Sequence, residues 1–260
     1  MAQVPLSKLH GTYNDFVVLD QRSQAVPDVV AFARHVCNRR AAIGADGLLV
    51  ILPSKVADAR MRIINADGSE AEMCGNGVRC VARFLNESGE ADELKIETVA
   101  GIIETRIISK TPTYTVRVNM GTPRVQAATA ASQNGWVVSM GNPHVVIFSE
   151  DDIEAVALPE LAEEFQKGPT FPSGTNVHIA RVTDAQTLQV RHWERGVGLT
   201  LACGTGAVAC AAVAVRNGTL RSPVDVHVPG GKLLIEWDGL GDAFMSGPAI
   251  HVFDTTIIWQ

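Results

Sequence analysis

The sequence lacks the features that mark several large classes of protein. Its 22 basic and 28 acidic residues give a formal net charge of −6, and the basic residues form no block or stripe with aromatics. That pattern disfavours a nucleic-acid or anionic-membrane surface. The longest apolar runs, such as "FVVLD" and "GLLVILP", are far too short to span a bilayer. The first residues, "MAQVPLSKLHG", have neither the basic start nor the apolar stretch of a signal peptide, so we expect a cytoplasmic protein.

The cysteines also lack the spacings of a disulfide framework or a metal site. There are 5 of them, and no pair shows the C-x-x-C spacing of a zinc knuckle or a redox site. The motif H-E-x-x-H is absent too. Metal binding is therefore a weak interpretation, and we expect no metal. Three cysteines lie in apolar helical stretches and are interpreted as small core residues: Cys37, Cys80 and Cys210.

The residues that are present describe an ordinary globular protein. The 260 residues are 46% hydrophobic and 19% charged, which allows an ample core in one large domain or two small ones. Runs rich in β-branched residues, with near-alternation of apolar and polar positions, predict several strands in each half. Two helices are predicted per half. They cover 27–40 and a segment after Cys74 in the first half, and 158–167 and a segment after Cys203 in the second.

The two halves of the chain carry the same motifs in the same order. The longest match has no gap, and it pairs Cys74 with Cys203 and aligns two C-G-x-G tetrads. A second match upstream pairs Asn14 with Asn142. The matched segments are 14–20 with 142–148, 44–50 with 174–180, and 62–77 with 191–206. We interpret the chain as two similar domains of about 120 to 130 residues each.

The domain boundaries follow from the repeat. The final strand, "IHVFDTTIIWQ", is expected to return to the first half. The first domain then comprises 1–118 plus 249–260, and the second comprises 119–248. The segment 120–135 is rich in Ala, Thr and Gly and is interpreted as the connection between the halves.

Cys74 and Cys203 each stand directly before a Gly-x-Gly that opens a predicted helix. The unpaired N–H groups and the positive end of the dipole at such a place attract an anion and lower the pKa of a thiol. Two thiols in similar halves suit one task in particular, which is to remove a proton from a stereocentre and return one to its opposite face. Such a reaction needs no cofactor if the carbanion is stabilised electrostatically.

The other polar residues of the repeat fit an amino-acid substrate. In "HWERG", the Arg195 guanidinium suits a carboxylate and the Glu194 carboxylate suits an ammonium group, although adjacent charges are most often only solvated. His144 in "GNPH" is either a core histidine at a strand start or a group that tunes a neighbouring thiol. Five asparagines lie within the repeated blocks, each a turn or cap residue when taken alone and together a polar pocket: Asn14, Asn65, Asn76, Asn142 and Asn176.

At these residues the sequence resembles the diaminopimelate epimerase family over essentially its whole length. The segments that carry the resemblance are "NDFVVLD", "NADGSEAEMCGNGVRC", "SMGNPH", "ERGVGLTLACGTGA" and "PGGKLLIEWDG". The resemblance implies an α/β (α+β) fold of two similar domains, each a barrel-like, mainly antiparallel sheet around a central helix. It implies an active site in the cleft between them, no cofactor, a cytoplasmic homodimer, and interconversion of LL- and meso-diaminopimelate in lysine and peptidoglycan precursor synthesis.

The resemblance also assigns roles to residues. Cys74 and Cys203 are implied to be base and acid, exchanging roles with the direction of reaction. Glu194 and His144 are implied to set the pKa values of the thiols. The residues implied to bind substrate are Asn14, Asn65, Gly75, Asn76, Asn142, Asn176, Glu194, Arg195, Gly204 and Thr205.

Two positions depart from the family pattern, and three alternative functions stay open. Tyr13 replaces a usual glycine beside Asn14, and Gly47 stands where many members have a substrate-contacting glutamine. The same chemistry would serve a racemase of histidine, proline or glutamate. Arg195 and three asparagines, however, suit a distal pocket that binds a second carboxylate of the substrate, which favours diaminopimelate. A phenazine-pathway isomerase has a related duplicated fold but is disfavoured by the cysteine pair. A non-catalytic redox or metal-binding module is the remaining alternative.

Overall fold

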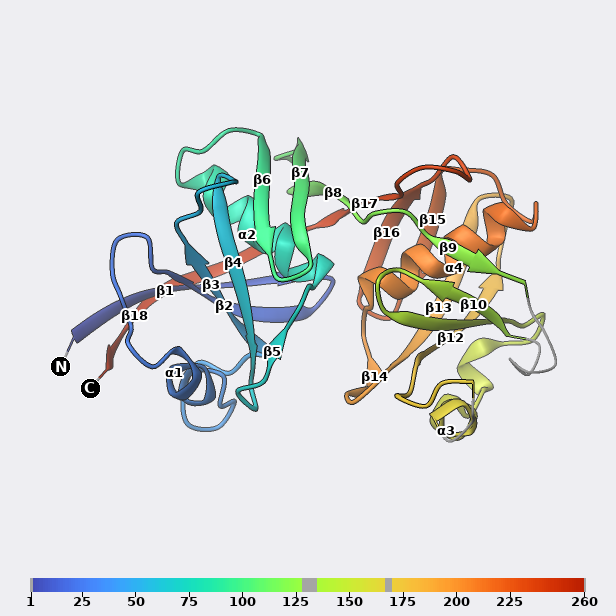
Figure 1. Cartoon of the computed structure of the whole chain (residues 1–260), viewed down its shortest axis with the longest axis horizontal. Coiled ribbons are helices and arrows are strands. Elements are labelled where there is room, and N and C mark those ends of the chain that lie inside the picture. Colours follow the sequence, from blue (N-terminus) through green and yellow to red (C-terminus); the bar gives the residue numbers. More distant parts are fainter. Residues whose placement is uncertain (1, 128–134, 167–169, 260) are drawn as a thin grey trace. The chain divides into compact units, whose positions relative to one another are not determined.

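The computed structural model describes residues 2–127, 135–166 and 170–259 of the chain (Figure 1). The chain divides into two compact units, Met1–Val118 with Gly247–Gln260 and Asn119–Ser246. It passes from the first unit to the second at the end of β8 (Thr115–Asn119) and returns within β17 (Phe244–Pro248). Within the described ranges, no helix is both long and apolar enough to cross a membrane.

The first unit is a mainly antiparallel sheet that contains both ends of the chain. Besides β8, its elements are β1 (Ala2–Gly11), β2 (Asn14–Asp20), α1 (Val29–Val36), β3 (Gly47–Leu52), β4 (Ala59–Asn65), β5 (Glu70–Ala71), α2 (Gly75–Glu87), β6 (Glu93–Thr98), β7 (Gly101–Ser109) and β18 (Ile250–Trp259). Strand β1 pairs antiparallel with β2 and with β18, which Figure 1 shows side by side. The pairs β2–β3 and β4–β6 are parallel, whereas β3–β4, β4–β5, β6–β7 and β7–β8 are antiparallel.

The second unit repeats this pairing pattern. Besides β17, its elements are β9 (Arg124–Gln126), β10 (Trp136–Ser139), β11 (Pro143–Phe148), the 3-10 turn η2 (Ile153–Ala155), α3 (Leu158–Gln166), β12 (Asn176–Val182), β13 (Thr187–Glu194), β14 (Gly198–Thr200), α4 (Gly204–Arg216), β15 (Val224–Val228) and β16 (Gly231–Glu236). The pairs β11–β12 and β13–β15 are parallel. The other pairs are antiparallel: β9–β10, β10–β11, β12–β13, β13–β14, β15–β16 and β16–β17. The sequence repeat therefore corresponds to a repeat of strand order and direction.

One helix lies at the centre of each unit. Helix α2 contacts β1, β2, β3, β4, β6, β7 and β18, and α4 contacts β9, β10, β11, β12, β13, β15 and β16. Figure 1 shows each helix with strands of its own unit around it. A helix enclosed in this way has little solvated face, which is why the sequence of α4, "GTGAVACAAVAVR", is almost entirely small and apolar.

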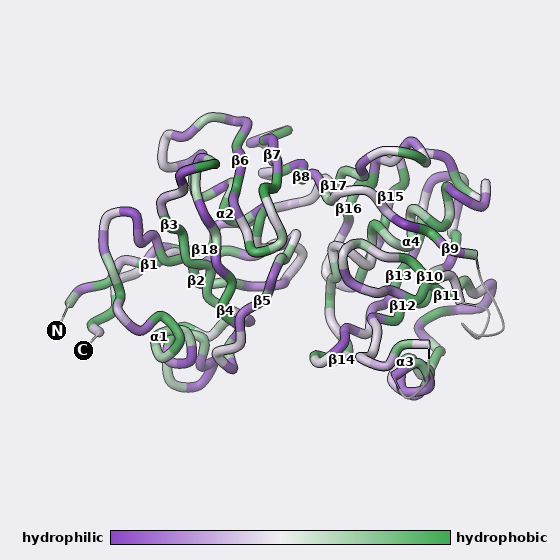
Figure 2. Tube along the Cα trace, in the orientation of Figure 1, coloured by the Kyte–Doolittle hydropathy of each residue, from purple (hydrophilic) through white to green (hydrophobic). Residues whose placement is uncertain are grey.

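A second helix in each unit packs on the outer face of the sheet. Phe32, Ala33 and Val36 of α1 are buried in a cluster that includes Leu48 and Val50 of β3, and Figure 2 shows α1 as largely hydrophobic. Because side chains alternate along a strand, the residue between them turns to the other face, toward α2. In the second unit, α3 buries Leu158, Ala162 and Phe165 in a similar cluster.

The outer helix of the first unit is shorter than the sequence predicts. The segment 27–40 forms a helix only over Val29–Val36, because the Asp28 side chain caps its start by accepting from Ala31 N. At the other end, the Asn38 side chain accepts hydrogen bonds from the next backbone N–H groups and makes a turn. The predicted helix 158–167 is observed over Leu158–Gln166, and residue 167 lies outside the described residues.

Five strands were not predicted from the sequence: β1, β5, β9, β14 and β17. Strand β1 occupies the N-terminal segment and is held between β2 and β18, contacts that no local pattern reveals. Strand β9 lies in the segment interpreted as a connection and pairs with β10, so that part of 120–135 belongs to the second unit. Residues 128–134 of that segment lie outside the described residues.

The strand registers correct one of the sequence matches by a residue. Ile63 pairs with Leu49 in the first unit, and His192 pairs with His178 in the second. Since Ile63 and His192 are matched without a gap, His178 corresponds to Leu49. The gapless match of 44–50 with 174–180, which laid His178 over the preceding leucine, is therefore wrong along these strands. The loops before β3 and β12 differ in length by one residue.

Candidate functional site

Each central helix begins directly after one of the two matched cysteines. Cys74 and Cys203 are the N-caps of α2 and α4, with extended backbones at φ −144°, ψ 112° and φ −117°, ψ 110°. The residues implied to bind the substrate carboxylate, Gly75 with Asn76 and Gly204 with Thr205, form the first helical positions. The unpaired N–H groups of a first turn and the positive end of the helix dipole are thus at each thiol.

In the first unit, Cys74 lies in a cluster of amides. Its Sγ is 3.5 Å from Asn14 Oδ1, which also accepts a 3.3 Å hydrogen bond from Asn76 Nδ2. The other end of the Asn14 amide donates to Asp46 Oδ2 at 2.7 Å. The structure therefore brings together Asn14, Cys74 and Asn76, which are far apart in the sequence.

A charge network supports the strand start that carries Asn14. Asp15 accepts hydrogen bonds from Lys8 and from Arg39, and Arg39 also bonds Asp46 at 2.7 Å. Burial raises the pKa of Asp15, but the hydrogen bonds from Arg39 and Lys8 outweigh it and lower the pKa to about 2. Asp46, which is bound to both Arg39 and Asn14, connects the network to the cluster at Cys74. Neither Asp46 nor Lys8 was singled out from the sequence.

The turn between β1 and β2 has an unusual backbone. Thr12 and Tyr13 have φ values of 51° and 62°, a region that disfavours residues with a Cβ. The buried Arg79 guanidinium donates to Thr12 Oγ1 at 3.2 Å, and Thr12 Oγ1 donates to Asn76 Oδ1 at 3.3 Å. The exposed Tyr13 ring stacks on His10 with ring centres 5.2 Å apart. The turn next to Asn14 is therefore held by side-chain contacts on both of its faces.

In the second unit, Cys203 is buried, and burial raises the pKa of its thiol well above the usual value, with the Glu194 carboxylate acting in the same direction. Two contacts oppose this rise: Gly206 N–H donates to Cys203 Sγ at 3.4 Å, and Thr205 Oγ1 lies at 3.6 Å. The N–H at the helix start lowers the thiol pKa of Cys203 as predicted, but the loss of solvent outweighs it and the net shift is upward.

The predicted distal residues of the second unit are linked through Asn176. Its Oδ1 accepts a 3.0 Å hydrogen bond from Arg195 N, and its Nδ2 donates to Pro143 O at 3.0 Å. The Arg195 side chain donates to Ser173 O at 3.1 Å. Gly174 allows this arrangement, since at φ 74° a Cβ there would lie 3.2 Å from the Arg195 side chain. Asn176 thus fixes the end of β13, where Glu194 and Arg195 lie.

His144 bonds the predicted substrate residue Asn142. His144 Nε2 lies 2.8 Å from Asn142 Oδ1, and His144 Nδ1 lies 2.8 Å from His178 Nε2. His178 Nδ1 in turn lies 2.9 Å from His192 Nδ1. The sequence did not single out His178 or His192. The only signal was that both interrupt strands made mostly of apolar residues.

Asn65 is the predicted site residue least connected to the others of its unit. It ends β4, and its Nδ2 donates to Ser69 Oγ at 2.9 Å in the turn before β5.

The three remaining cysteines, Cys37, Cys80 and Cys210, are buried, and burial raises the pKa of each. They are core residues, as predicted. Among residues 2–127, 135–166 and 170–259, no group of three or more His, Cys, Asp or Glu side chains is arranged to hold a metal ion.

The profile of the family described as diaminopimelate epimerase matches residues 6–126 and 136–252. The chain belongs to the diaminopimelate epimerase family. The diaminopimelate epimerase of Desulforudis audaxviator is 44% identical over 270 residues, covering 95% of this chain and 97% of its own. That of Halothermothrix orenii is 41% identical over 283 residues and covers 99% of both chains. The predicted family is confirmed.

Solved structures with the same architecture support the predicted fold. A phenazine biosynthesis protein of the PhzF family from Bacillus anthracis has a TM-score of 0.78 at 17% identity and covers 100% of both chains. A hydroxyproline epimerase from Agrobacterium vitis has a TM-score of 0.72 at 17% identity, covering 99% of this chain and 91% of its own. Such low identity shows the fold alone. The predicted α/β (α+β) class with two similar, mainly antiparallel domains around central helices is confirmed.

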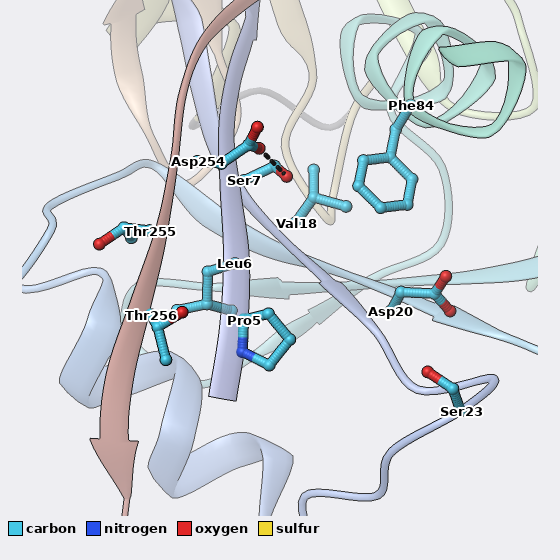
Figure 3. A pocket seen from close by; sticks show the side chains of 10 residues that line it. All are labelled: Pro5, Leu6, Ser7, Val18, Asp20, Ser23, Phe84, Asp254, Thr255 and Thr256. Atoms are coloured by element: carbon cyan, nitrogen blue, oxygen red, sulfur yellow. Dashed lines mark hydrogen bonds between the residues drawn. The ribbon is translucent and has the colours of Figure 1, made fainter. Parts of the chain in front are cut away.

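A hollow in the first unit lies apart from the residues that the family resemblance singles out. It measures about 380 Å³ and is lined by side chains of β1, β2, α2 and β18 and of the turn after β2, as Figure 3 shows. Its two carboxylates are already partnered, Asp254 by Ser7 at 2.6 Å and Asp20 by Arg22 at 2.9 Å. None of the predicted diaminopimelate-binding residues lines it. The hollow is therefore not part of the candidate site, whose cysteines begin α2 in one unit and α4 in the other.

Proposed function

We propose that the protein is a diaminopimelate epimerase that interconverts the LL and meso isomers without a cofactor. The observation that carries this proposal is the presence of Cys74 and Cys203 at the starts of two equivalent buried helices in a member of this family. By its substrate, the enzyme would serve lysine and peptidoglycan precursor synthesis, and we propose a cytoplasmic location for it.

The reaction is a 1,1-proton transfer between the two thiols. One cysteine, as thiolate, takes the α-proton, and the other, as thiol, donates its proton to the opposite face of the carbanion. At the end the two sulfurs have exchanged protonation states, so the reverse reaction starts with their roles exchanged. The raised pKa of Cys203 means that this residue carries a proton in the substrate-free protein.

The first turns of α2 and α4 supply the stabilisation of the carbanion. The α-carboxylate accepts hydrogen bonds from N–H groups at Gly75 with Asn76 and at Gly204 with Thr205, where charge builds up as the proton leaves. Asn14 contacts the substrate beside Cys74. Buried donors that are already oriented need no rearrangement during the reaction.

The remaining polar residues recognise the rest of the amino acid. Glu194 pairs with the ammonium group, and Arg195 binds the distal carboxylate together with Asn65, Asn142 and Asn176. Glu194 also keeps Cys203 protonated, because a nearby negative charge disfavours a thiolate. Bound ammonium would weaken that effect, so substrate itself would lower the pKa of Cys203.

Exchange of the substrate α-hydrogen in heavy water tests this function. The metal-free protein should incorporate deuterium into LL- and meso-diaminopimelate, and Cys74→Ala or Cys203→Ala should reduce the rate of epimerisation by at least about a thousandfold. Cys210→Ala is the matched control, since it removes a core thiol from the same helix as Cys203 and should retain activity. An absence of exchange at every pH at which the protein is folded would overturn the proposal.

A panel of amino acids in the same assay separates the alternatives. Faster exchange of proline, histidine or glutamate than of diaminopimelate would identify a racemase of another substrate. Bound zinc at one equivalent, or loss of activity with a chelator, would identify a metal-dependent function. These outcomes contradict the proposed epimerase in different ways.

We also propose that the enzyme is a homodimer. The support is the family resemblance together with three exposed apolar side chains on β18, those of Val252, Phe253 and Ile258. Size-exclusion chromatography with light scattering should give twice the mass of one chain, which is 27.8 kDa. A monomeric mass across the micromolar range would contradict this.

A further inference from the structure

Three histidines lie together in the core of the second unit. His144, His178 and His192 come from the adjacent strands β11, β12 and β13, and each has a relative exposure of 1% or less. Their rings are close, with centres 5.1 Å apart for the first pair and 4.9 Å for the second. Burying three imidazoles is unfavourable unless their nitrogens are bonded, so their presence calls for a physical reason.

The fold itself does not need these histidines. The matched positions in the first unit, given the strand registers described above, are Phe16, Leu49 and Ile63. All three are buried apolar side chains of β2, β3 and β4. The same architecture is therefore packed with hydrocarbon at these places in one unit and with imidazole in the other.

The hydrogen bonds of the three histidines run in one direction. Asn142 Oδ1 is an acceptor, so the His144 nitrogen that bonds it, Nε2, carries the proton. A neutral ring has one N–H, so His144 Nδ1 accepts from His178 Nε2. By the same reasoning, His178 Nδ1 accepts from His192 Nδ1. Each ring donates toward Asn142 and accepts from the ring behind it.

At the His192 end of this series of hydrogen bonds, the Thr200 hydroxyl is a suitable donor. His192 Nε2, which the chain leaves as an acceptor, has no hydrogen-bond partner among the described residues, and the same holds for Thr200 Oγ1. These two residues are direct cross-strand partners in β13 and β14. Their Cβ atoms are thus about 5 Å apart, within reach of one bridging water. The hydroxyl hydrogen of Thr200 would continue the same direction of donation.

All three rings are neutral at physiological pH. Burial lowers the pKa of His144 and of His192 to about 3, and it lowers the pKa of His178 well below the usual value. Neutral rings make each imidazole a donor at one nitrogen and an acceptor at the other, as the chain requires. The cationic Arg195 lowers the pKa of His144 further.

The middle ring also lies against the helix start that carries the thiol. A Cβ added at Gly206 would come within 2.4 Å of the His178 ring, and Gly206 N–H is the group that donates to Cys203 Sγ. In the first unit, a Cβ at Gly77 would instead meet Leu49 at 3.0 Å. The hydrogen-bonded histidines therefore extend from the first turn of α4 to Asn142.

We propose that His178 and His192 are positioning residues: through His144, their chain of hydrogen bonds holds the Asn142 amide with its oxygen turned inward and its NH₂ group presented to the substrate. This rests on the function proposed above, in which Asn142 binds the distal carboxylate. An amide without this support can turn its carbonyl oxygen toward that carboxylate and lose the hydrogen bond, so fixing the amide favours binding.

Substitutions taken from the first unit test this role with little risk to folding. His178→Leu and His192→Ile install the residues that the matched positions carry. We expect the KM for diaminopimelate to rise by about fivefold to tenfold, as for one lost hydrogen bond, with kcat changed by less than about twofold. An unchanged KM in both variants would overturn the proposal.

Conservative variants separate positioning from packing. The amide nitrogen of His144→Gln can replace Nε2, and that of His192→Asn can replace Nδ1, so each should keep a lower KM than His144→Leu and His192→Ile. A purely structural role predicts equal kinetics within each pair, with differences only in the melting temperature. That result would contradict the proposal.

The nitrogen-15 spectrum of the histidine rings in the full, substrate-free chain gives a readout independent of any substrate. Three neutral rings should appear, protonated at Nε2 of His144, at Nε2 of His178 and at Nδ1 of His192. A proton on Nδ1 of His144 would show that the chain does not run toward Asn142. Because this measurement needs no turnover, it stays decisive if the exchange assay shows that diaminopimelate is not the substrate.

Discussion

Cys74 and Cys203 occupy matched positions and yet have different surroundings. Cys74 is half-buried beside the amides of Asn14 and Asn76, whereas Cys203 is buried beside a hydroxyl, an N–H group and the Glu194 carboxylate. A two-thiol enzyme needs one thiolate and one thiol at the start of each turnover. The Glu194 charge and the burial of Cys203 favour the thiol form there, so asymmetry between the residues fits the proposed chemistry.

At the residue scale, Arg195→Leu should weaken substrate binding and leave the protein stable. Its exposed guanidinium donates to the Ser173 carbonyl, a contact with one loop residue. The loss of a charge-assisted pair with the distal carboxylate should raise KM by about tenfold to a hundredfold. Steady-state kinetics measure this, with the exposed Arg221→Leu as the control. Equal KM values for both variants would favour a substrate without a second carboxylate.

At the element scale, the matched helices α2 and α4 pack against their sheets through glycine. Gly77 faces a leucine side chain, which can shift, whereas Gly206 faces the His178 ring, which two hydrogen bonds hold in place. The second glycine of each C-G-x-G tetrad is therefore required for close packing of helix on strand.

Gly206→Ala should consequently be more harmful than Gly77→Ala. The added methyl group overlaps the imidazole at 2.4 Å in one case and touches a leucine methyl at 3.0 Å in the other. We expect Gly206→Ala to lower the free energy of unfolding by about 1 to 3 kcal/mol, as overpacking does, and Gly77→Ala to cost less. Urea denaturation of both variants provides the comparison. A larger loss for Gly77→Ala would contradict the packing argument.

At the scale of the whole molecule, the buried histidines should make stability depend on pH. The pKa values of His144 and His192 are lowered to about 3 in the folded protein, against 6.5 for an ordinary histidine, because burial disfavours the cation. Below pH 6.5 the unfolded chain binds protons that the folded chain does not. The contribution of these neutral rings is therefore fully present above pH 6.5, and it is lost progressively as the pH falls toward 3.

We expect the melting temperature of the parent protein to fall more steeply between pH 7 and pH 4 than that of the double variant His178→Leu with His192→Ile. Asp15, whose pKa is lowered to about 2 despite burial, also destabilises the fold in acid, but it does so in both proteins and chiefly at lower pH. Differential scanning calorimetry across this range tests the difference. Parallel curves would show that the histidines do not titrate with unfolding.

Much of the architecture was readable from local patterns. The starts of α2 and α4 at the two tetrads follow from glycine and apolar periodicity. Strand β1 was not predicted, because its stability comes from β2 and from β18 at the opposite end of the chain. The length of α1 was overestimated, because a single asparagine side chain ends it.

The sequence by itself determined the duplication, the two matched cysteines and the family, because these are properties of residue order and spacing. Only the tertiary structure decided how side chains distant in sequence act on one another. It placed Asp46 against Asn14, and it set His178 in line with His144 and His192. It also raised the pKa of Cys203, since burial depends on everything packed around a group rather than on its neighbours along the chain.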